Sequence, residues 1–294
     1  MKSAPFDYAM MDSVDGVTDA LAEAGDEAMI IAGGQTLVPM MALRLARPAL
    51  LVDINGVAEL KGIAEAPDRV SIKACTRQAE AMSSDVVRDR LPLLAKALPN
   101  IGHAQTRNRG TVGGSIALGD PAAEIPLVAT ALDARLTLRN REGARERAIA
   151  GFYEGPMMAL RDADECLTEV HFPVWLGAGT IGTAFQEASQ RHGDFAIVAA
   201  AAQLQLDAGG VCTRAALAVG GAAPYPVRIE RAEEILTGST LDDDAVAAAV
   251  DEVEAAIDPQ TDPQASAVYR RRVAKVLSGR VIREAARDAR GEAS

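Results

Sequence analysis

Two glycine-rich segments constrain the fold of this chain more than any other feature. The first is Ala32-Gly33-Gly34-Gln35-Thr36 and the second is Arg109-Gly110-Thr111-Val112-Gly113-Gly114-Ser115, so each places a Gly-Gly pair beside a hydroxyl residue. Because glycine lacks a Cβ atom, the backbone can adopt positive φ there and approach a ligand closely. Successive N–H groups in such turns can converge on an anion. Two such segments in one domain could hold the two phosphates of a dinucleotide, whereas either one alone is also typical of a tight turn.

The first glycine segment lies between a predicted strand and a predicted helix. Residues 28–32 are apolar and predict a buried strand, residues 36–45 have helical spacing, and residues 50–54 predict a second strand. Together they predict a compact βαβ-like unit in which the helix dipole adds to the N–H groups of the turn. Ser13 and Gly25 have the residue types that begin and end a preceding helix.

The second glycine segment lies in residues 100–120, which show no clear period. A long irregular stretch inside a compact domain is typically functional or disordered, and the regular segments on both sides favour a functional loop. Around it we expect a helix capped by Thr76 and the following regular segments: strands at 69–74, 135–138 and 167–172, and helices at 91–98 and 121–132.

A domain boundary is predicted near residues 173–179. Strand-like segments follow at 180–187, 197–206 and 215–219, then helices at 230–236, 242–257 and 266–290. The last helix is basic, with Tyr269, Arg270 and Arg271 expected on its exposed side and an apolar stripe of Val268, Val273, Val276, Leu277, Val281 and Ile282. The segment Gly177–Gly182 matches G-x-G-x-x-G, but no acid follows at the required offset, so an interdomain linker is expected.

Composition limits the classes of function. The net charge of −11 argues against a nucleic-acid partner, and no apolar run approaches the ~20 residues of a membrane span, so we expect a cytoplasmic protein. Three cysteines and three histidines are scattered without the spacing of a metal site or a disulfide framework. We find no nucleophile–base pairing and expect no catalytic side chain. The chemistry, if there is any, would belong to a bound cofactor.

The chain resembles the FAD-binding medium subunit of molybdenum hydroxylases, a family that includes aerobic carbon monoxide dehydrogenase and the flavin domain of xanthine dehydrogenase. The resemblance rests on AGGQTLVPMMALRLARPALLVDI (residues 32–54) and IGHAQTRNRGTVGGSIALGDPAAEIP (residues 101–126), which look like that family's two flavin motifs. Residues 184–201 and 219–228 are similar to its C-terminal domain. Relatives often have Asn at position 115 and Asp at position 124, where this chain has Ser115 and Glu124.

The resemblance implies an α+β fold. An FAD-binding domain of the vanillyl-alcohol-oxidase (PCMH) type would span residues 1–175, with subdomains at about 1–55 and 56–175, and a smaller α+β C-terminal domain would span residues 176–294. FAD would lie between the two subdomains.

The resemblance also implies site residues. Residues 31–38 would wrap the pyrophosphate with backbone N–H groups, residues 111–115 would hold it from the other side, and the rest would contact the flavin ring or the sugar and ribityl hydroxyls. The implied FAD ligands are Ile31, Ala32, Gly33, Gly34, Gln35, Thr36, Leu37, Val38, Ile101, Thr111, Val112, Gly113, Gly114, Ser115, Glu124, Leu167 and Gln186.

In that family the organic substrate is oxidised elsewhere in the complex. The resemblance therefore implies a large molybdopterin-binding subunit, a small subunit with [2Fe-2S] clusters, and an external electron acceptor, which would be a quinone, oxygen or NAD. A dimer of heterotrimers is expected. Two alternatives stay open: a self-contained FAD-dependent oxidase or dehydrogenase of the same fold, and a scaffold subunit without flavin. The intact Gly-Gly pairs disfavour the scaffold.

Overall fold

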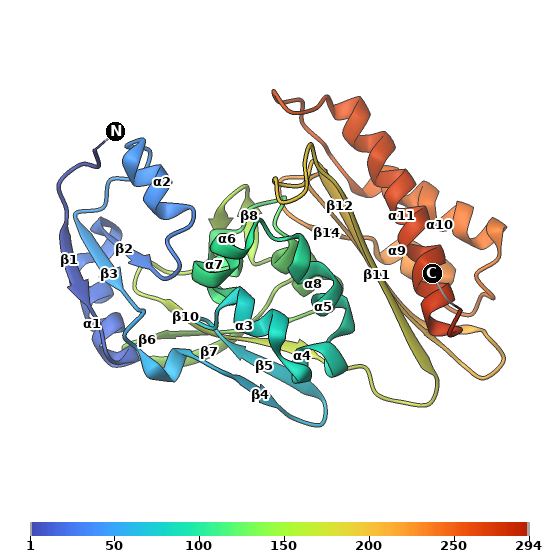
Figure 1. The fold of residues 1–294 in the computed structure, drawn as a ribbon, viewed down its shortest axis with the longest axis horizontal. Helices are drawn as coiled ribbons and strands as arrows, with labels where there is room; N and C mark the ends of the chain where they lie inside the picture. The colour runs from blue at the N-terminus through green and yellow to red at the C-terminus, as the bar shows by residue number, and fades with distance from the viewer. Residues whose placement is uncertain (1, 293–294) are drawn as a thin grey trace.

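The computed structural model describes residues 2–292 and shows three sheets arranged along the long axis of the molecule (Figure 1). At one end lies a three-stranded parallel sheet in the order β1-β3-β2, which is the blue part of Figure 1. Its elements are β1 (Asp7–Met10), α1 (Val14–Ala24), η1 (Gly25–Glu27), β2 (Ala28–Ile31), α2 (Leu37–Ala42) and β3 (Leu50–Asp53). The predicted strand–turn–helix–strand unit is confirmed, and so are both ends of α1: Ser13 Oγ accepts from the Gly16 N–H, and Gly25 is the C-cap.

The middle of the molecule is a five-stranded antiparallel sheet packed against helices. The strand order is β4-β5-β10-β6-β7. The strands are β4 (Ile63–Glu65), β5 (Arg69–Lys73), β6 (Arg135–Asn140), β7 (Gly143–Ala148) and β10 (Cys166–Pro173), with a small hairpin of β8 (Tyr153–Gly155) and β9 (Met158–Ala159). The helices are η2 (Ala58–Leu60), α3 (Gln78–Ser83), α4 (Asp85–Arg90), α5 (Pro92–Ala97), η3 (Leu98–Asn100), α6 (Ala104–Arg109), α7 (Val112–Leu118) and α8 (Glu124–Ala131).

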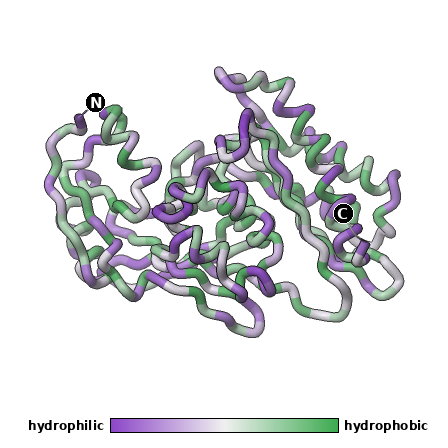
Figure 2. The backbone as a smooth tube through the Cα atoms, in the orientation of Figure 1, coloured by the Kyte–Doolittle hydropathy of each residue, from purple (hydrophilic) through white to green (hydrophobic). Residues whose placement is uncertain are grey.

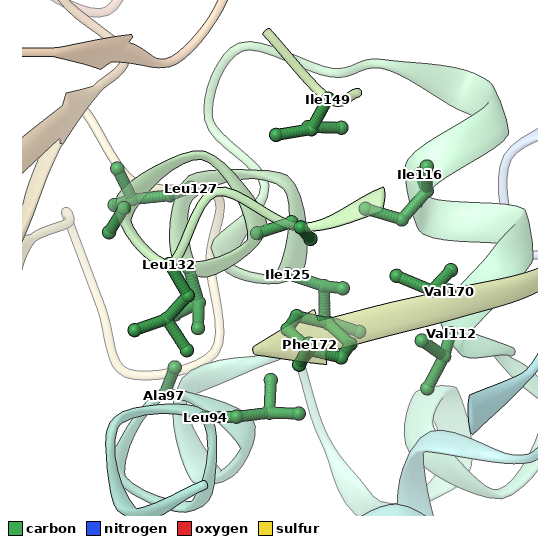
Figure 3. Close-up of a cluster of buried hydrophobic side chains, with 14 of the residues drawn as sticks. Leu94, Ala97, Val112, Ile116, Ile125, Leu127, Leu132, Ile149, Val170 and Phe172 are labelled. Carbon is green, nitrogen blue, oxygen red and sulfur yellow. The ribbon is translucent and has the colours of Figure 1, made fainter. Parts of the chain in front are cut away.

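The largest core lies between this sheet and its helices. Figure 3 shows Val170 and Phe172 of β10 facing Leu94 of α5, Ile116 of α7 and Ile125 of α8. Burial of such aliphatic and aromatic side chains supplies most of the favourable free energy of folding.

The other end carries a four-stranded antiparallel sheet in the order β11-β12-β13-β14. Its elements are β11 (Thr180–Ala188), β12 (Val198–Leu206), β13 (Cys212–Gly220), β14 (Val227–Arg228), α9 (Glu230–Leu236), α10 (Asp243–Ala256) and α11 (Ala267–Ala289). Every residue of β12 is buried, because α11 covers one face of the sheet and α8 packs on the other. The alanine run Ala199–Ala202 leaves room for helices on both faces.

The stretch 100–120, expected to be an irregular loop, contains two helices and a 3₁₀ turn. The expectation was wrong because α6 and α7 are too short to show a helical period. The second of them is set by a local cap, in which Thr111 Oγ1 accepts from the Gly114 N–H at 3.0 Å.

Four smaller expectations also need correction. The helix expected over 36–45 spans only Leu37–Ala42, and the one expected from Pro121 begins at Glu124, after a turn in which Ala123 N–H donates to Asp120 O. Thr76 caps no helix, because its hydroxyl bonds to Gly62 instead. In α11, Val268 and Val276 are exposed, and Arg270 is buried.

Apolar and polar residues interleave along the whole chain trace (Figure 2). Within residues 2–292, no helix combines the length and the apolar character that crossing a membrane requires.

Candidate cofactor-binding site

The two glycine segments lie in direct contact. A Cβ atom added to Gly33 would overlap the carbonyl oxygen of Arg109 and would lie 2.8 Å from the Cα atom of Gly110. Only glycine therefore allows the turn after β2 to rest on the backbone before α7. This contact joins the three-stranded sheet to the five-stranded one at the place where the two segments were expected to share a ligand.

Two polar side chains tie the segments together, and neither was predicted. Asn55 Nδ2 donates to Ala32 O at 2.7 Å, and Asn55 Oδ1 accepts from Arg77 Nη2 at 2.6 Å. Arg77 Nη1 in turn donates to Arg109 O. The sequence signal available was Asn55-Gly56, which we interpreted only as the end of the βαβ-like unit.

Asp53 orients this asparagine. Its Oδ1 accepts from the backbone N–H and from the amide of Asn55, at 2.8 and 2.6 Å, while Tyr8 donates to Oδ2 at 2.6 Å. Burial alone would raise the pKa of Asp53, but these hydrogen bonds to its charged form outweigh burial, so the pKa lies below its ordinary value. A charged Asp53 thus holds Asn55 across both segments.

The first glycine segment presents free backbone donors. Within the described chain, no hydrogen bond uses the N–H groups of residues 33–37, and the first N–H after them, that of Val38, donates to Gly34 O at 3.0 Å. Gly34 has φ +70°, where a side chain would be strained. Five consecutive free N–H groups between a strand and a helix match the donor set that a pyrophosphate requires.

The second glycine segment has its donors occupied. Val112 N–H donates to Thr76 O and Gly113 N–H to Ala74 O, while the N–H groups of Gly114 and Ser115 donate to Thr111. Positive φ, expected for both Gly-Gly pairs, occurs only at Gly34. Gly113 is required for packing instead, because a Cβ atom there would lie 2.5 Å from Ala74 Cα.

The remaining predicted ligands come from four different elements. Ile101 follows η3 and Leu167 lies in β10, and both are buried in the same core cluster. Glu124 is the first residue of α8 and Gln186 lies in β11. Gln186 points toward α11, where its Nε2 donates to Glu284 Oε2 at 2.6 Å, so the structure does not bring its amide to Glu124.

A buried carboxyl lies on the α8 side of the site. Glu124 is 7% exposed. Burial raises the pKa of Glu124 to about 8; a hydrogen bond from its own backbone N–H opposes this effect, and the nearby charges of Glu187 and Asp120 add to it. Burial likewise raises the pKa of Glu187 to about 7. A carboxyl that holds its proton near neutral pH can donate to a hydroxyl oxygen as well as accept from one.

A loop of the C-terminal half approaches the same region. A Cβ atom on Gly193 would lie 2.6 Å from His103 Cε1 and 3.0 Å from Gly102 O. Arg107 donates to the carbonyl oxygens of Ile101 and Gly102. It therefore shapes the turn that carries Ile101 and His103.

The residues present fit FAD at its phosphates and its hydroxyls. The N–H groups of residues 33–37 and the buried Oε2 atom of Glu187, which lies close enough to Glu124 to affect its pKa, lack a hydrogen-bond partner within the described chain. No group of His, Cys, Asp and Glu residues in that part of the chain has the arrangement of a metal site.

Comparison with known proteins places the chain in a family. Residues 4–175 match the model of the FAD binding domain in molybdopterin dehydrogenase, and residues 183–285 match the CO dehydrogenase flavoprotein C-terminal domain. The chain is 41% identical to the 6-hydroxypseudooxynicotine dehydrogenase complex subunit alpha of Paenarthrobacter nicotinovorans, over 99% of this chain and 97% of that protein. It is 35% identical to the carbon monoxide dehydrogenase medium chain of Hydrogenophaga pseudoflava, over 95% of both.

Solved structures agree in fold. The model superposes on reconstituted CO dehydrogenase from Oligotropha carboxidovorans with a TM-score of 0.95 at 34% identity, covering 98% of this chain and 100% of that one. It superposes on quinoline 2-oxidoreductase from Pseudomonas putida 86 with a TM-score of 0.92 at 33% identity, covering 98% and 99%. The expected α+β fold and the expected family are both confirmed: this chain belongs to the FAD-binding medium subunits of the molybdenum hydroxylases, and its cofactor is FAD.

Proposed function

We propose that this chain receives electrons from a small [2Fe-2S] subunit and passes them to an external acceptor: a quinone, oxygen or NAD. The observation that carries the proposal is the run of five free N–H groups at residues 33–37, locked against the second glycine segment. When bound, FAD supplies the redox chemistry, since it exchanges electrons singly or in pairs. The chain itself positions the cofactor and excludes water.

In the proposed placement, the free donors of residues 33–37 bind the pyrophosphate from one side and Thr111–Ser115 contact it from the other. Because the N–H groups of residues 112–115 are occupied, this second contact comes from the Thr111 N–H, the Ser115 hydroxyl and the glycine surface. Glu124 holds sugar or ribityl hydroxyls, and Ile101 and Leu167 pack against the ring. Gln186 reaches the ring only if its amide leaves Glu284.

The same proposal divides the chain into units. The three-stranded sheet supports a subdomain of about residues 1–55, the five-stranded sheet one of 56–175, and the four-stranded sheet a C-terminal domain of 176–294. The extents of the two family models, 4–175 and 183–285, are consistent with a division near residue 175.

We further propose a large molybdopterin-binding subunit as the site of substrate oxidation, and a dimer of heterotrimers as the assembly. Relatives carry names such as "medium chain", "medium subunit" and "complex subunit alpha", which identify each as one part of a larger enzyme. A self-contained oxidase would need substrate-activating groups of its own. Among residues 2–292, no group of His, Cys, Asp and Glu residues has the arrangement that a metal-dependent oxidase would use.

Rapid mixing tests this function. The isolated chain with bound FAD, mixed with xanthine, carbon monoxide or an aldehyde, should keep its oxidised flavin spectrum. The same chain reduced with dithionite should be reoxidised by oxygen, benzoquinone or NAD⁺. In the purified complex, limiting dithionite should reduce iron–sulfur clusters that then pass electrons to the flavin. Bleaching of the isolated chain by any of the three organic or gaseous substrates would instead establish a self-contained oxidase.

A further inference from the structure

One strand edge of the C-terminal sheet is only partly covered. β11 is an edge strand, since only β12 pairs with it. The hydrogen bonds of Thr183 show which backbone groups of β11 point away from β12. Its N–H donates to Asp288 Oδ2 at 2.8 Å, and its C=O accepts from Lys96 Nζ at 2.6 Å. Natural proteins commonly block sheet edges with such charged groups. Here the block stops at residue 183.

Beyond the block, the outward groups have no partner. Antiparallel pairing alternates along a strand, and β11 pairs with β12 without a bulge, so Phe185 and Glu187 share the outward orientation of Thr183. Within residues 2–292, no hydrogen bond uses the N–H or C=O groups of Phe185 or Glu187. Phe185 is buried in the main core, so the N–H and C=O groups of Glu187 are the pair that this edge leaves accessible.

This open edge lies along a groove of about 550 Å³. We call it the β11 groove; it runs between residues 186–188, Asn100 and one side of α11. In Figure 1, β11 and α11 run beside each other at this end of the molecule. The helix side of the groove reaches from Tyr269 to Arg280, about 16 Å at the rise of an α-helix. That length matches about five residues of extended chain.

The groove is lined by apolar side chains, by two arginines and by one acid, Glu187. Tyr269 and Val276 are 47% and 45% exposed, which is unusual for large apolar side chains on a packed helix. Arg272 and Arg280 also line the groove, yet the ion pairs of α11 in the described chain use Arg270, Lys275, Arg283 and Asp288 instead. Two unpaired arginines in a chain of net charge −11 mark a site for negative charge.

We propose that the β11 groove binds an extended, acidic segment of one of the other two subunits, whose main chain pairs with the edge of β11 at Glu187. Main-chain hydrogen bonds supply affinity in this mode of recognition, and side-chain pockets supply specificity. Carboxylates of the segment pair with Arg272 and Arg280, and its apolar side chains cover Tyr269 and Val276. The proposal rests on the proposed function, because it draws the partner from the same complex.

Hydrogen exchange of the isolated chain and of the purified complex tests it directly. The Glu187 amide should exchange at least tenfold more slowly in the complex. The Thr183 amide, which already donates to Asp288, should exchange at the same rate in the isolated chain and in the complex. Equal rates for Glu187 in both samples would overturn the proposal. Slowing that occurs in the isolated chain and rises with its concentration would identify a second copy as the occupant and would also overturn it.

Two matched pairs of variants test the contribution of the arginine charge and that of the backbone hydrogen bond separately. Arg280→Glu should lower the recovery of the partner subunits with the tagged chain more than tenfold, whereas Arg287→Glu, on the same helix outside the groove, should not. Glu187→Pro removes an outward N–H and should lower recovery, whereas Ile181→Pro removes one outside the groove and should not; proline is tolerated at such edge positions. Equal recovery within both pairs would refute the groove. If both pairs show equal recovery but dithionite-reduced clusters still reduce the flavin in the complex, the groove proposal is wrong and the proposed function stands. If no partner subunits copurify with the wild-type chain, the groove proposal and the proposed function are both wrong.

Discussion

The two glycine segments have similar sequences, but their backbone N–H groups differ in whether they are already hydrogen-bonded. At residues 33–37 the N–H groups are free and Gly34 has positive φ, so the glycines leave donors open for a ligand. At residues 112–115 the N–H groups already donate to Thr76, Ala74 and Thr111, and Gly113 is needed for close packing on Ala74. A Gly-Gly pair can thus serve a ligand directly, or it can position the helix against which the ligand rests.

The largest expected effect concerns packing at the second segment. Gly113→Ala places a methyl group on Ala74 and should lower the free energy of unfolding by about 3 kcal/mol, the upper end of typical overpacking costs. Urea denaturation followed by circular dichroism measures this. FAD should be lost together with stability. Unchanged stability in Gly113→Ala would mean that α7 is not held on β5 as described.

The first segment should respond in the opposite manner. Gly34→Val puts a β-branched residue at φ +70° in a half-buried turn, 3.1 Å from the Val38 side chain, and this strain should cost about 2 kcal/mol. Flavin content after desalting should fall below a tenth of the wild-type value, whereas the thermal midpoint should fall by only about 4 to 8 °C. Acid precipitation should release the wild-type flavin, since neither glycine segment contains a cysteine or histidine for covalent attachment. Full flavin occupancy in Gly34→Val would refute the assignment of the free donors.

A smaller effect is expected where the two segments are joined. Asn55→Ala removes the bridge between Ala32 and Arg77 and should cost about 1 kcal/mol, with FAD affinity roughly fivefold to tenfold weaker. Fluorescence titration of the apoprotein with FAD measures the affinity. Asn140→Ala, in a turn remote from both segments, is the matched control. Equal affinities in the two variants would show that the bridge does not position the segments.

Only the side of the site near the second segment carries buried acids, which predicts a dependence on pH. The folded protein keeps the Glu124 proton up to about pH 8, whereas the unfolded chain releases it near 4.5, the ordinary pKa of a glutamate side chain. Between these pH values the folded state binds more protons, so the free energy of unfolding falls as pH rises. Glu124→Gln should make that fall shallower, as measured by urea unfolding at several pH values, and exposed Glu154→Gln should not. If the free energy of unfolding of Glu124→Gln depends on pH as steeply as that of the wild type, a group other than Glu124 binds the proton.

The smallest effect is expected one residue from the largest. A methyl group on Gly114 would contact only the Thr111 side chain. In Gly114→Ala it would push against the Thr111 hydroxyl that caps α7, which destabilises the helix, but alanine also has a higher helix propensity than glycine, which offsets this cost. We expect the free energy of unfolding to change by less than about 1 kcal/mol and FAD to stay bound. Loss of flavin in Gly114→Ala alone would mean that this backbone, too, contacts the phosphates.

Local signals explain which features could be predicted. Ser13 and Gly25 act over a few residues, and they predicted both ends of α1 correctly. The contact of Gly33 with Arg109 and the occupation of the second segment by Ala74 and Thr76 depend on tertiary packing, which no local pattern encodes. The burial of Arg270 has the same origin. Its guanidinium donates to Ile197 O and Gly221 O, 73 and 49 residues away in sequence, and to Asp262, eight residues before it.

The largest core cluster includes Phe185, Ala199, Ala201 and Ala218, so the wall behind α8 is contributed by the C-terminal sheet. A protein truncated after residue 175 would expose the apolar side of α8 to water over its length. Such a fragment would be expected to aggregate when expressed, even though it contains both glycine segments and matches a complete family model. Flavin binding by this chain would therefore depend on the whole polypeptide. A chimaera joined near residue 175 would fold only if the surfaces of its two halves that meet at α8 came from proteins with complementary packing there.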